Sequence, residues 1–127
     1  MIRPATLNLF AQRHAPFVYA ILFDGIDLTG ATLDMHVRLL PDTPGAPLID
    51  LSPASAGTQG LSMVHAGGSS TITIQIDETT IETMMTALAP EVGVNTTLAY
   101  DLQITRSGQP KAVFFRGNFT VEAGVTT

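Results

Sequence analysis

The chain has 127 residues, a formal net charge of −5 and no cysteine. A chain of this length fits one domain with a single core, and the lack of cysteine excludes disulfides, thiolate catalysis and cysteine-ligated zinc. We therefore predict a single domain over residues 1–127 that is held together by packing alone.

Charged residues make up 13% of the chain, about half the ~25% that is usual in soluble domains, and threonine occurs seventeen times. Threonine combines a hydroxyl group with a β-branched carbon, which suits solvent-facing positions on strands. The composition therefore favours an all-β fold. A surface with so little charge is poorly protected against association, so its solvated face is a candidate interface.

The six basic residues are scattered along the sequence: Arg3, Arg13, Arg38, Arg106, Lys111 and Arg116. Phosphate binding needs a concentrated basic patch, so we expect no nucleic-acid partner. The longest apolar run, residues 17–23, is far shorter than the ~20 residues that span a bilayer, so we expect no membrane partner. The amino-terminal residues lack a signal-peptide core, which predicts assembly in the cytoplasm.

In chain order, residues 6–12 alternate between polar and apolar side chains, and residues 17–23 form an unbroken apolar run. We interpret this run either as a central strand covered on both faces or as a strand whose outer face meets a partner. Asp24-Gly25 predicts a turn, and residues 31–39 alternate clearly enough to predict a strand.

Three prolines between positions 41 and 47 predict a loop, because proline cannot donate to a strand ladder. Residues 48–51 and 61–64 are expected to form short strands, and residues 71–77 a longer one with isoleucines on one face.

The apolar period then changes to that of a helix, with Ile81, Met84, Met85 and Leu88 on one side. We predict one short α-helix near residues 79–89, which begins with a capping box from Thr79 to Glu82 and ends before Pro90. Met84 and Met85 are expected to pack this helix onto the sandwich in preference to lining a partner groove.

The last quarter of the chain predicts a β-hairpin, with strands at residues 97–105 and 111–122 and a turn between them. Gly117 is expected at a bulge or a close contact. The opposite face, with Asp101, Phe114 and Arg116, is where we expect a partner. The predicted core face comprises Leu98, Tyr100, Leu102, Ile104, Val113, Phe115, Phe119 and Val121.

Seven or eight short strands separated by turn signals predict an antiparallel β-sandwich, immunoglobulin-like or jelly-roll-like, with one short helix. Phe17, Tyr19 and Ile21 of the apolar run, with Phe114 and Arg116 of the hairpin, form the candidate protein interface. Phe114 is an aromatic residue on the polar face of its strand, which indicates either a second packing layer or a protein interface.

Motifs for chemistry are weak. His14, His36 and His65 lie at no recognisable metal-ligand spacing, and residues 24–27 resemble the start of a calcium loop without its further ligands. A turn stabilised by Asp side chains explains the same residues. The sequence has no Gly-x-Ser-x-Gly nucleophile motif and no phosphate loop with its lysine. We predict no catalytic residue, no cofactor and no metal.

Several segments together resemble a known family. These are Phe23-Asp24-Gly25-Ile26-Asp27-Leu28-Thr29-Gly30-Ala31, the strand centred on Tyr100-Asp101-Leu102, and Phe115-Arg116-Gly117-Asn118-Phe119-Thr120-Val121 with the closing Val125-Thr126. The pattern is similar to small structural proteins of tailed phages, in particular the β-sandwich amino-terminal domains of phage baseplate upper proteins. The resemblance implies a virion component without catalytic residues.

The resemblance leads us to expect a non-enzymatic structural component of a tailed phage particle, in the tail, baseplate or neck, that docks in multiple copies. Its partners would be other virion proteins and further copies of itself, and it would be located in the virion after assembly in the bacterial cytoplasm. Because the chain ends at Thr127 without the extension of the baseplate proteins, a capsid-surface decoration protein is an alternative. A carbohydrate-binding host-attachment module is a second alternative, weakened by the absence of tryptophan.

Overall fold

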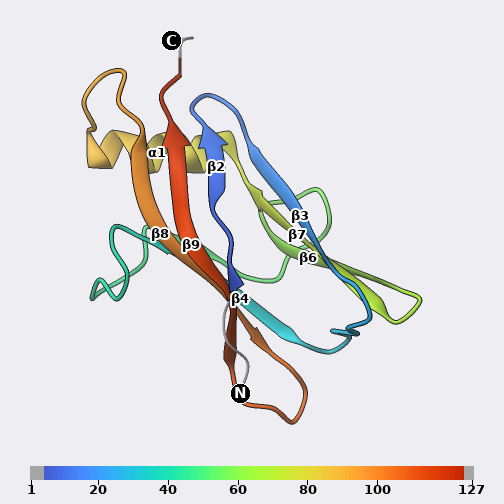
Figure 1. The fold of residues 1–127 in the computed structure, drawn as a ribbon. Coiled ribbons are helices and arrows are strands. Elements are labelled where there is room, and N and C mark those ends of the chain that lie inside the picture. The colour runs from blue at the N-terminus through green and yellow to red at the C-terminus, as the bar shows by residue number, and fades with distance from the viewer. Residues whose placement is uncertain (1–4, 125–127) are drawn as a thin grey trace.

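The computed structural model describes residues 5–124 and shows two packed β-sheets with one short helix across one end (Figure 1). The predicted all-β sandwich is confirmed. The strands are β1 (Ala5–Thr6), β2 (Leu9–Gln12), β3 (Phe17–Phe23), β4 (Thr32–Arg38), β5 (Ile49–Leu51), β6 (Gly60–Ala66), β7 (Ser69–Ile76), β8 (Thr96–Thr105) and β9 (Ala112–Glu122), and the helix is α1 (Glu78–Leu88). No helix of the described part is long and apolar enough to cross a bilayer. Val125-Thr126, part of the family resemblance, lies outside the described residues.

The sheet order identifies the type of sandwich. The larger sheet has the order β1-β9-β8-β4-β5, with β2 also paired to β9, and the smaller sheet has the order β3-β7-β6. An immunoglobulin sandwich places its strands B, E and D in one sheet and C, F and G in the other. In this protein, strands B, E and D correspond to β3, β7 and β6, and strands C, F and G correspond to β4, β8 and β9. The topology is therefore immunoglobulin-like.

The amino-terminal segment departs from the antiparallel prediction, because β1 and β2 both pair in parallel with β9. Residues 6–12 are also not one strand but are interrupted at Leu7 and Asn8. The Leu7 carbonyl crosses directly over Gly117, where an added Cβ would lie 2.5 Å from its oxygen. Gly117 is therefore at a close contact, as predicted, and Tyr100 Oη fixes the crossing by donating to Leu7 O at 2.6 Å.

The core lies between the sheets and contains most of the predicted side chains. Leu98, Tyr100, Leu102, Ile104, Phe119 and Val121 are all buried. Val113 and Phe115 are only half-buried. They flank a register shift at which Leu102 pairs with Phe115 but Gln103 pairs with Val113, so the alternation of β9 is interrupted there.

The helix α1 covers the end of the sandwich with its apolar side. Ile81, Met84 and Met85 are buried, which confirms their predicted packing onto the sheets. Ala89 takes a left-handed conformation with φ 48°, and Pro90 follows, so the helix ends there.

The predicted capping box is wrong. The helix begins at Glu78 after Asp77, and Thr79 lies inside it. Glu82 instead accepts from Arg13 Nε at 2.9 Å and from Arg13 Nη2 at 2.6 Å, and it also accepts from the backbone N–H of His14 at 3.1 Å. The hydrogen bonds from the Arg13 side chain are the main reason that the pKa of Glu82 falls to about 2. This ion pair joins the β2–β3 turn to the helix.

Candidate functional site

A groove of about 990 Å³ runs along the outer face of the larger sheet, over β4, β8 and β9. Its floor comes from side chains that alternate away from the core, including His36, Asp101 and Arg116. Its ends are formed by the β8–β9 turn and by the loop that follows β4. The predicted partner face of the terminal hairpin is therefore part of the floor of a concave surface.

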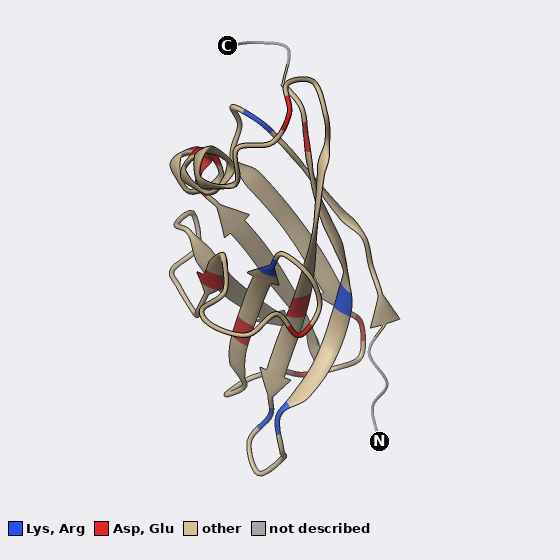
Figure 2. Ribbon diagram, turned by 90° about the vertical axis from the view of Figure 1, so that its left-hand side faces the viewer, with Lys and Arg blue, Asp and Glu red and all other residues tan. Residues whose placement is uncertain are grey.

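Four of the five Lys and Arg residues within residues 5–124 line this groove: Arg38, Arg106, Lys111 and Arg116. Among the described residues, only two carboxylates, Asp42 and Asp101, line it with them. Figure 2 shows basic segments where β8 and β9 meet their turn and acidic segments on α1 at the other end of the molecule. Residues that are scattered in the sequence thus gather into a local basic surface on an acidic protein.

Two of these cations have contacts within the fold. Arg38 Nη1 donates to the backbone oxygens of Thr43 at 3.0 Å and Gly45 at 2.6 Å, which holds the proline-rich loop against β4. The Arg106 guanidinium lies 5.9 Å from the centre of the Phe114 ring, a cation–π distance. These two residues shape the groove as well as charge it.

Lys111 and Arg116 are the cations most open to a partner. Within residues 5–124, the ion pairs shorter than 4.0 Å involve neither of them. Arg116 stands opposite Asp101 in the β8–β9 register, but Asp101 Oδ1 accepts from Gln103 Nε2 at 3.1 Å. The groove therefore offers exposed positive charge to an anionic group.

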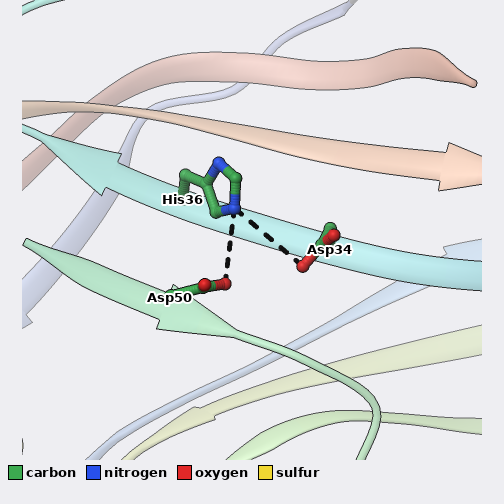
Figure 3. A group of neighbouring side chains, drawn as sticks. All are labelled: Asp34, His36 and Asp50. Atoms are coloured by element: carbon green, nitrogen blue, oxygen red, sulfur yellow. Dashed lines mark ion pairs between the residues drawn. The ribbon is translucent and has the colours of Figure 1, made fainter. Parts of the chain in front are cut away.

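His36, on the floor of the groove, faces two carboxylates (Figure 3). Its Nε2 lies 3.3 Å from Asp50 Oδ1 on β5 and 4.0 Å from Asp34 Oδ1 on β4. One nitrogen and two oxygens within 4.8 Å of one another are donors that a divalent cation could use. Cross-strand pairing of His36 with Asp50 already accounts for the arrangement, and the Asp50 side chain is 59% exposed, so we assign no metal.

The remaining predicted interface residues lie elsewhere. Phe17 and Ile21 are 6% and 9% exposed, so their side chains belong to the core and not to a surface. Tyr19 is 39% exposed, and its ring stacks on that of Phe17. The outer face of β3 instead presents Val18 and Leu22. The predicted interface on β3 therefore used the alternate positions of the strand that face the core.

Phe114 does not stand on the polar face of a regular strand. It is the extra residue at the register shift of β9, and its half-buried ring lies 6.0 Å from the ring of Phe23 at the end of the core. Arg116 is exposed in the groove, as expected for the partner face. The interface role of both residues stays a prediction.

The outer face of the smaller sheet was not predicted as a surface. Val18, Leu22 and Val64 are 59%, 63% and 64% exposed, and the register places Leu22 and Val64 on either side of Thr71. No charged residue stands on this face of the described strands; its residues are Val18, Ala20, Leu22, Gly60, Ser62, Val64, Ala66, Ser69, Thr71, Thr73 and Gln75. The aromatic residues at both ends of β3 could have indicated that its odd-numbered positions face the core.

Asp27, part of the segment that resembles a calcium loop, acts within its own turn. Its Oδ1 accepts from the Thr29 hydroxyl at 2.5 Å and from the Thr29 backbone N–H at 2.9 Å. These bonds, the hydroxyl first, lower the pKa of Asp27. The predicted turn stabilised by Asp side chains is confirmed.

No protein-family model matches this chain, and no curated protein matches it significantly. The features of the molecule that bear on its function are the groove, the uncharged sheet face and the residue pattern of the strands and turns.

Proposed function

We propose that this protein is a non-enzymatic structural component of a tailed phage particle, in the tail, baseplate or neck, and that it docks in multiple copies through protein–protein contacts. The groove is the proposed binding surface for an acidic segment of another virion protein. The observation that carries the docking role is the gathering of four of the five cations of residues 5–124 on one concave face.

The charge of the groove selects the kind of partner. In a chain of net charge −5, random placement of the charged residues would leave most surfaces acidic. The groove is instead lined by four cations and two carboxylates. Opposite charge on a partner speeds the encounter and fixes its orientation. A segment with two or more carboxylates fits Lys111 and Arg116, while Asp42 and Asp101 disfavour the continuous negative charge of a nucleic acid.

The place in the particle comes from the family resemblance. Decoration of the capsid surface would use the same docking face and is the alternative location. A carbohydrate-binding role has less support, because Tyr100 beside the groove is 4% exposed and uses its hydroxyl on Leu7 O. Sugar sites usually present an open aromatic ring, which this residue cannot supply.

Mass spectrometry of purified particles of a phage that encodes this chain tests the location. We expect the chain in the particle at a copy number that matches a symmetric ring or shell. Its absence from particles that contain all other structural proteins would refute the proposal.

Charge substitution tests the docking surface. A Lys111→Gln and Arg116→Gln double variant removes two charges from the groove, whereas the control, Ala56→Asp with Val92→Asp, makes the same change of net charge at exposed positions outside it. We expect the groove variant to lose incorporation into particles at least about tenfold, because each interfacial charge pair is worth on the order of 1–2 kcal/mol. Equal incorporation of the two variants would exclude the groove as the docking surface.

A further inference from the structure

The strand β3 is an open edge of the smaller sheet. Among the described residues it pairs only with β7, and no strand lies on its other side. In an immunoglobulin sandwich, strand A lies in this sheet, whereas here β1 and β2 pair with β9 in the other sheet. Seven residues, about 24 Å of strand, thus present one row of backbone groups to solvent.

Nothing in β3 protects this edge. Proteins usually shield an edge strand with charges, prolines or bulges, because an unshielded edge pairs with other strands. Residues Phe17–Phe23 contain no charged residue and no proline, and their pairing with β7 is continuous. Val18 and Leu22 are also well exposed on the outer face, so the edge is suited to receive another apolar strand.

The sequence of β3 is approximately symmetric about Ala20. An aromatic residue stands at each end, Phe17 and Phe23, and branched aliphatic residues stand at Val18 and Leu22. Two such strands placed antiparallel about Ala20 pair along all seven positions, and only Tyr19 and Ile21 meet a residue of a different class. A two-fold axis makes each copy meet the same surface of the other, so an approximately symmetric edge suits a second copy better than an unrelated strand.

We propose that β3 pairs antiparallel with β3 of a second copy about a two-fold axis at Ala20, joining the two smaller sheets into one continuous sheet. In this register Val18 lies beside Leu22 of the second copy, and Ala20 lies beside its own counterpart. On the outer face, Val18 and Leu22 of each copy then lie on either side of the two small Ala20 side chains.

Charge also favours this arrangement. Each copy has net charge −5, so two copies approach most easily along a seam without charge. The first charge after the strand is Asp24. Parallel pairing would place the two Asp24 carboxylates side by side, whereas antiparallel pairing separates them by about 27 Å.

The pairing is expected to be weak for isolated chains. A seam of seven residues is small beside the roughly 1,200 Å² that a stable interface buries, so the dimer should form at high protein concentration. Other contacts that hold copies close together in a particle would strengthen it. The inference thus rests on the multi-copy part of the proposed function and is independent of the groove.

Cysteine cross-linking of the full chain tests the register, because the protein has no cysteine of its own. Directly opposed residues of antiparallel strands have Cα atoms about 4.5–5.5 Å apart, which a disulfide can bridge. Ala20→Cys should therefore give a disulfide-linked dimer under mild oxidation. Val64→Cys is the matched control, since Val64 is 64% exposed on the same sheet face but lies on β6.

A second pair of variants checks the two-fold axis. Val18→Cys alone places the two sulfur atoms four residues apart along the seam, about 14 Å, which is too far for a disulfide. An equimolar mixture of Val18→Cys and Leu22→Cys should form the mixed dimer as readily as Ala20→Cys forms its own.

We expect Ala20→Cys to cross-link at least tenfold faster than Val64→Cys. In sedimentation at high protein concentration, we expect Ala20→Lys to show less self-association than an Ala66→Lys control. Equal cross-linking rates for Ala20→Cys and Val64→Cys would overturn the proposal. Capture of Ala20→Cys in particles only by a different virion protein would overturn it too. In either case the groove proposal would still stand on its own test.

Discussion

Replacing Glu82 by Gln should weaken the attachment of the helix to the sandwich. Glu82 accepts hydrogen bonds from the Arg13 side chain and from the backbone of His14, and Gln keeps the shape of the side chain while removing its charge. Because Arg13 precedes β3 and Glu82 lies in α1, the loss should be measurable as a change in global stability.

The magnitude follows from the pKa of Glu82, which falls from 4.5 to about 2 in the folded protein. A lowering of this size corresponds to an upper limit of about 3 kcal/mol at neutral pH. The side chains of Arg13 and Glu82 are still 26% and 25% exposed, so water screens the pair and lowers its contribution. We expect Glu82→Gln to reduce the free energy of unfolding by about 1–2 kcal/mol, or the melting temperature by roughly 5 °C.

The pH dependence has a definite sign. The folded-state pKa of Glu82 is lowered, so its stabilisation is complete above the unfolded-state pKa of 4.5 and is lost as the pH falls towards about 2. Urea denaturation of the unmodified protein and of Glu82→Gln from pH 7 to pH 2 should show a difference in the free energy of unfolding. This difference should shrink as the pH falls from 4.5 towards about 2. Asp27, whose pKa is also lowered, is present in both proteins and cancels in the comparison.

Glu91→Gln is the matched control, because Glu91 is exposed and takes part in no ion pair shorter than 4.0 Å within residues 5–124. This control should behave like the unmodified protein within about 0.5 kcal/mol. The reasoning would be refuted if Glu82→Gln matched the control at pH 7, or if its deficit persisted unchanged at pH 2.

Three further substitutions test the packing. Gly117→Ala should cost about 2 kcal/mol or more in urea denaturation, because its Cβ would lie 2.5 Å from the Leu7 carbonyl oxygen; an unchanged midpoint would show that this crossing can move aside. Tyr100→Phe should cost about 1–2 kcal/mol, since Leu7 O loses its hydroxyl donor, and a neutral effect would mean that water replaces it. Met85→Ala should cost about 2–5 kcal/mol by thermal denaturation, whereas Thr86→Ala on the exposed side of the helix should cost almost nothing; similar values would contradict the burial of Met85.

Local patterns predicted most of the elements. Strands β4 and β7 were predicted because polar and apolar residues alternate along them, and the helix because its apolar residues recur with a helical period. The capping box was misjudged because Glu82 has a stronger partner in Arg13, which is 69 positions away in the chain. Short-range rules cannot weigh a contact between such distant residues.

The candidate surfaces were harder to predict. In β3 every residue is apolar or aromatic, so no alternation shows which positions face the core, and the exposed positions proved to be Val18 and Leu22 in place of Phe17 and Ile21. The groove cations come from separate parts of the sequence and meet only because β4, β8 and β9 lie side by side.

The sequence by itself determined most of the secondary structure, the all-β class and, apart from Val113 and Phe115, the side chains of the terminal hairpin that enter the core, because these depend on local periodicity and turn chemistry. Only the tertiary structure decided that β1 and β2 pair with β9, that four cations share one groove and that β3 is left as an open edge. Those features arise from strand order and register between distant segments, and they are fixed by the packing of the whole sandwich.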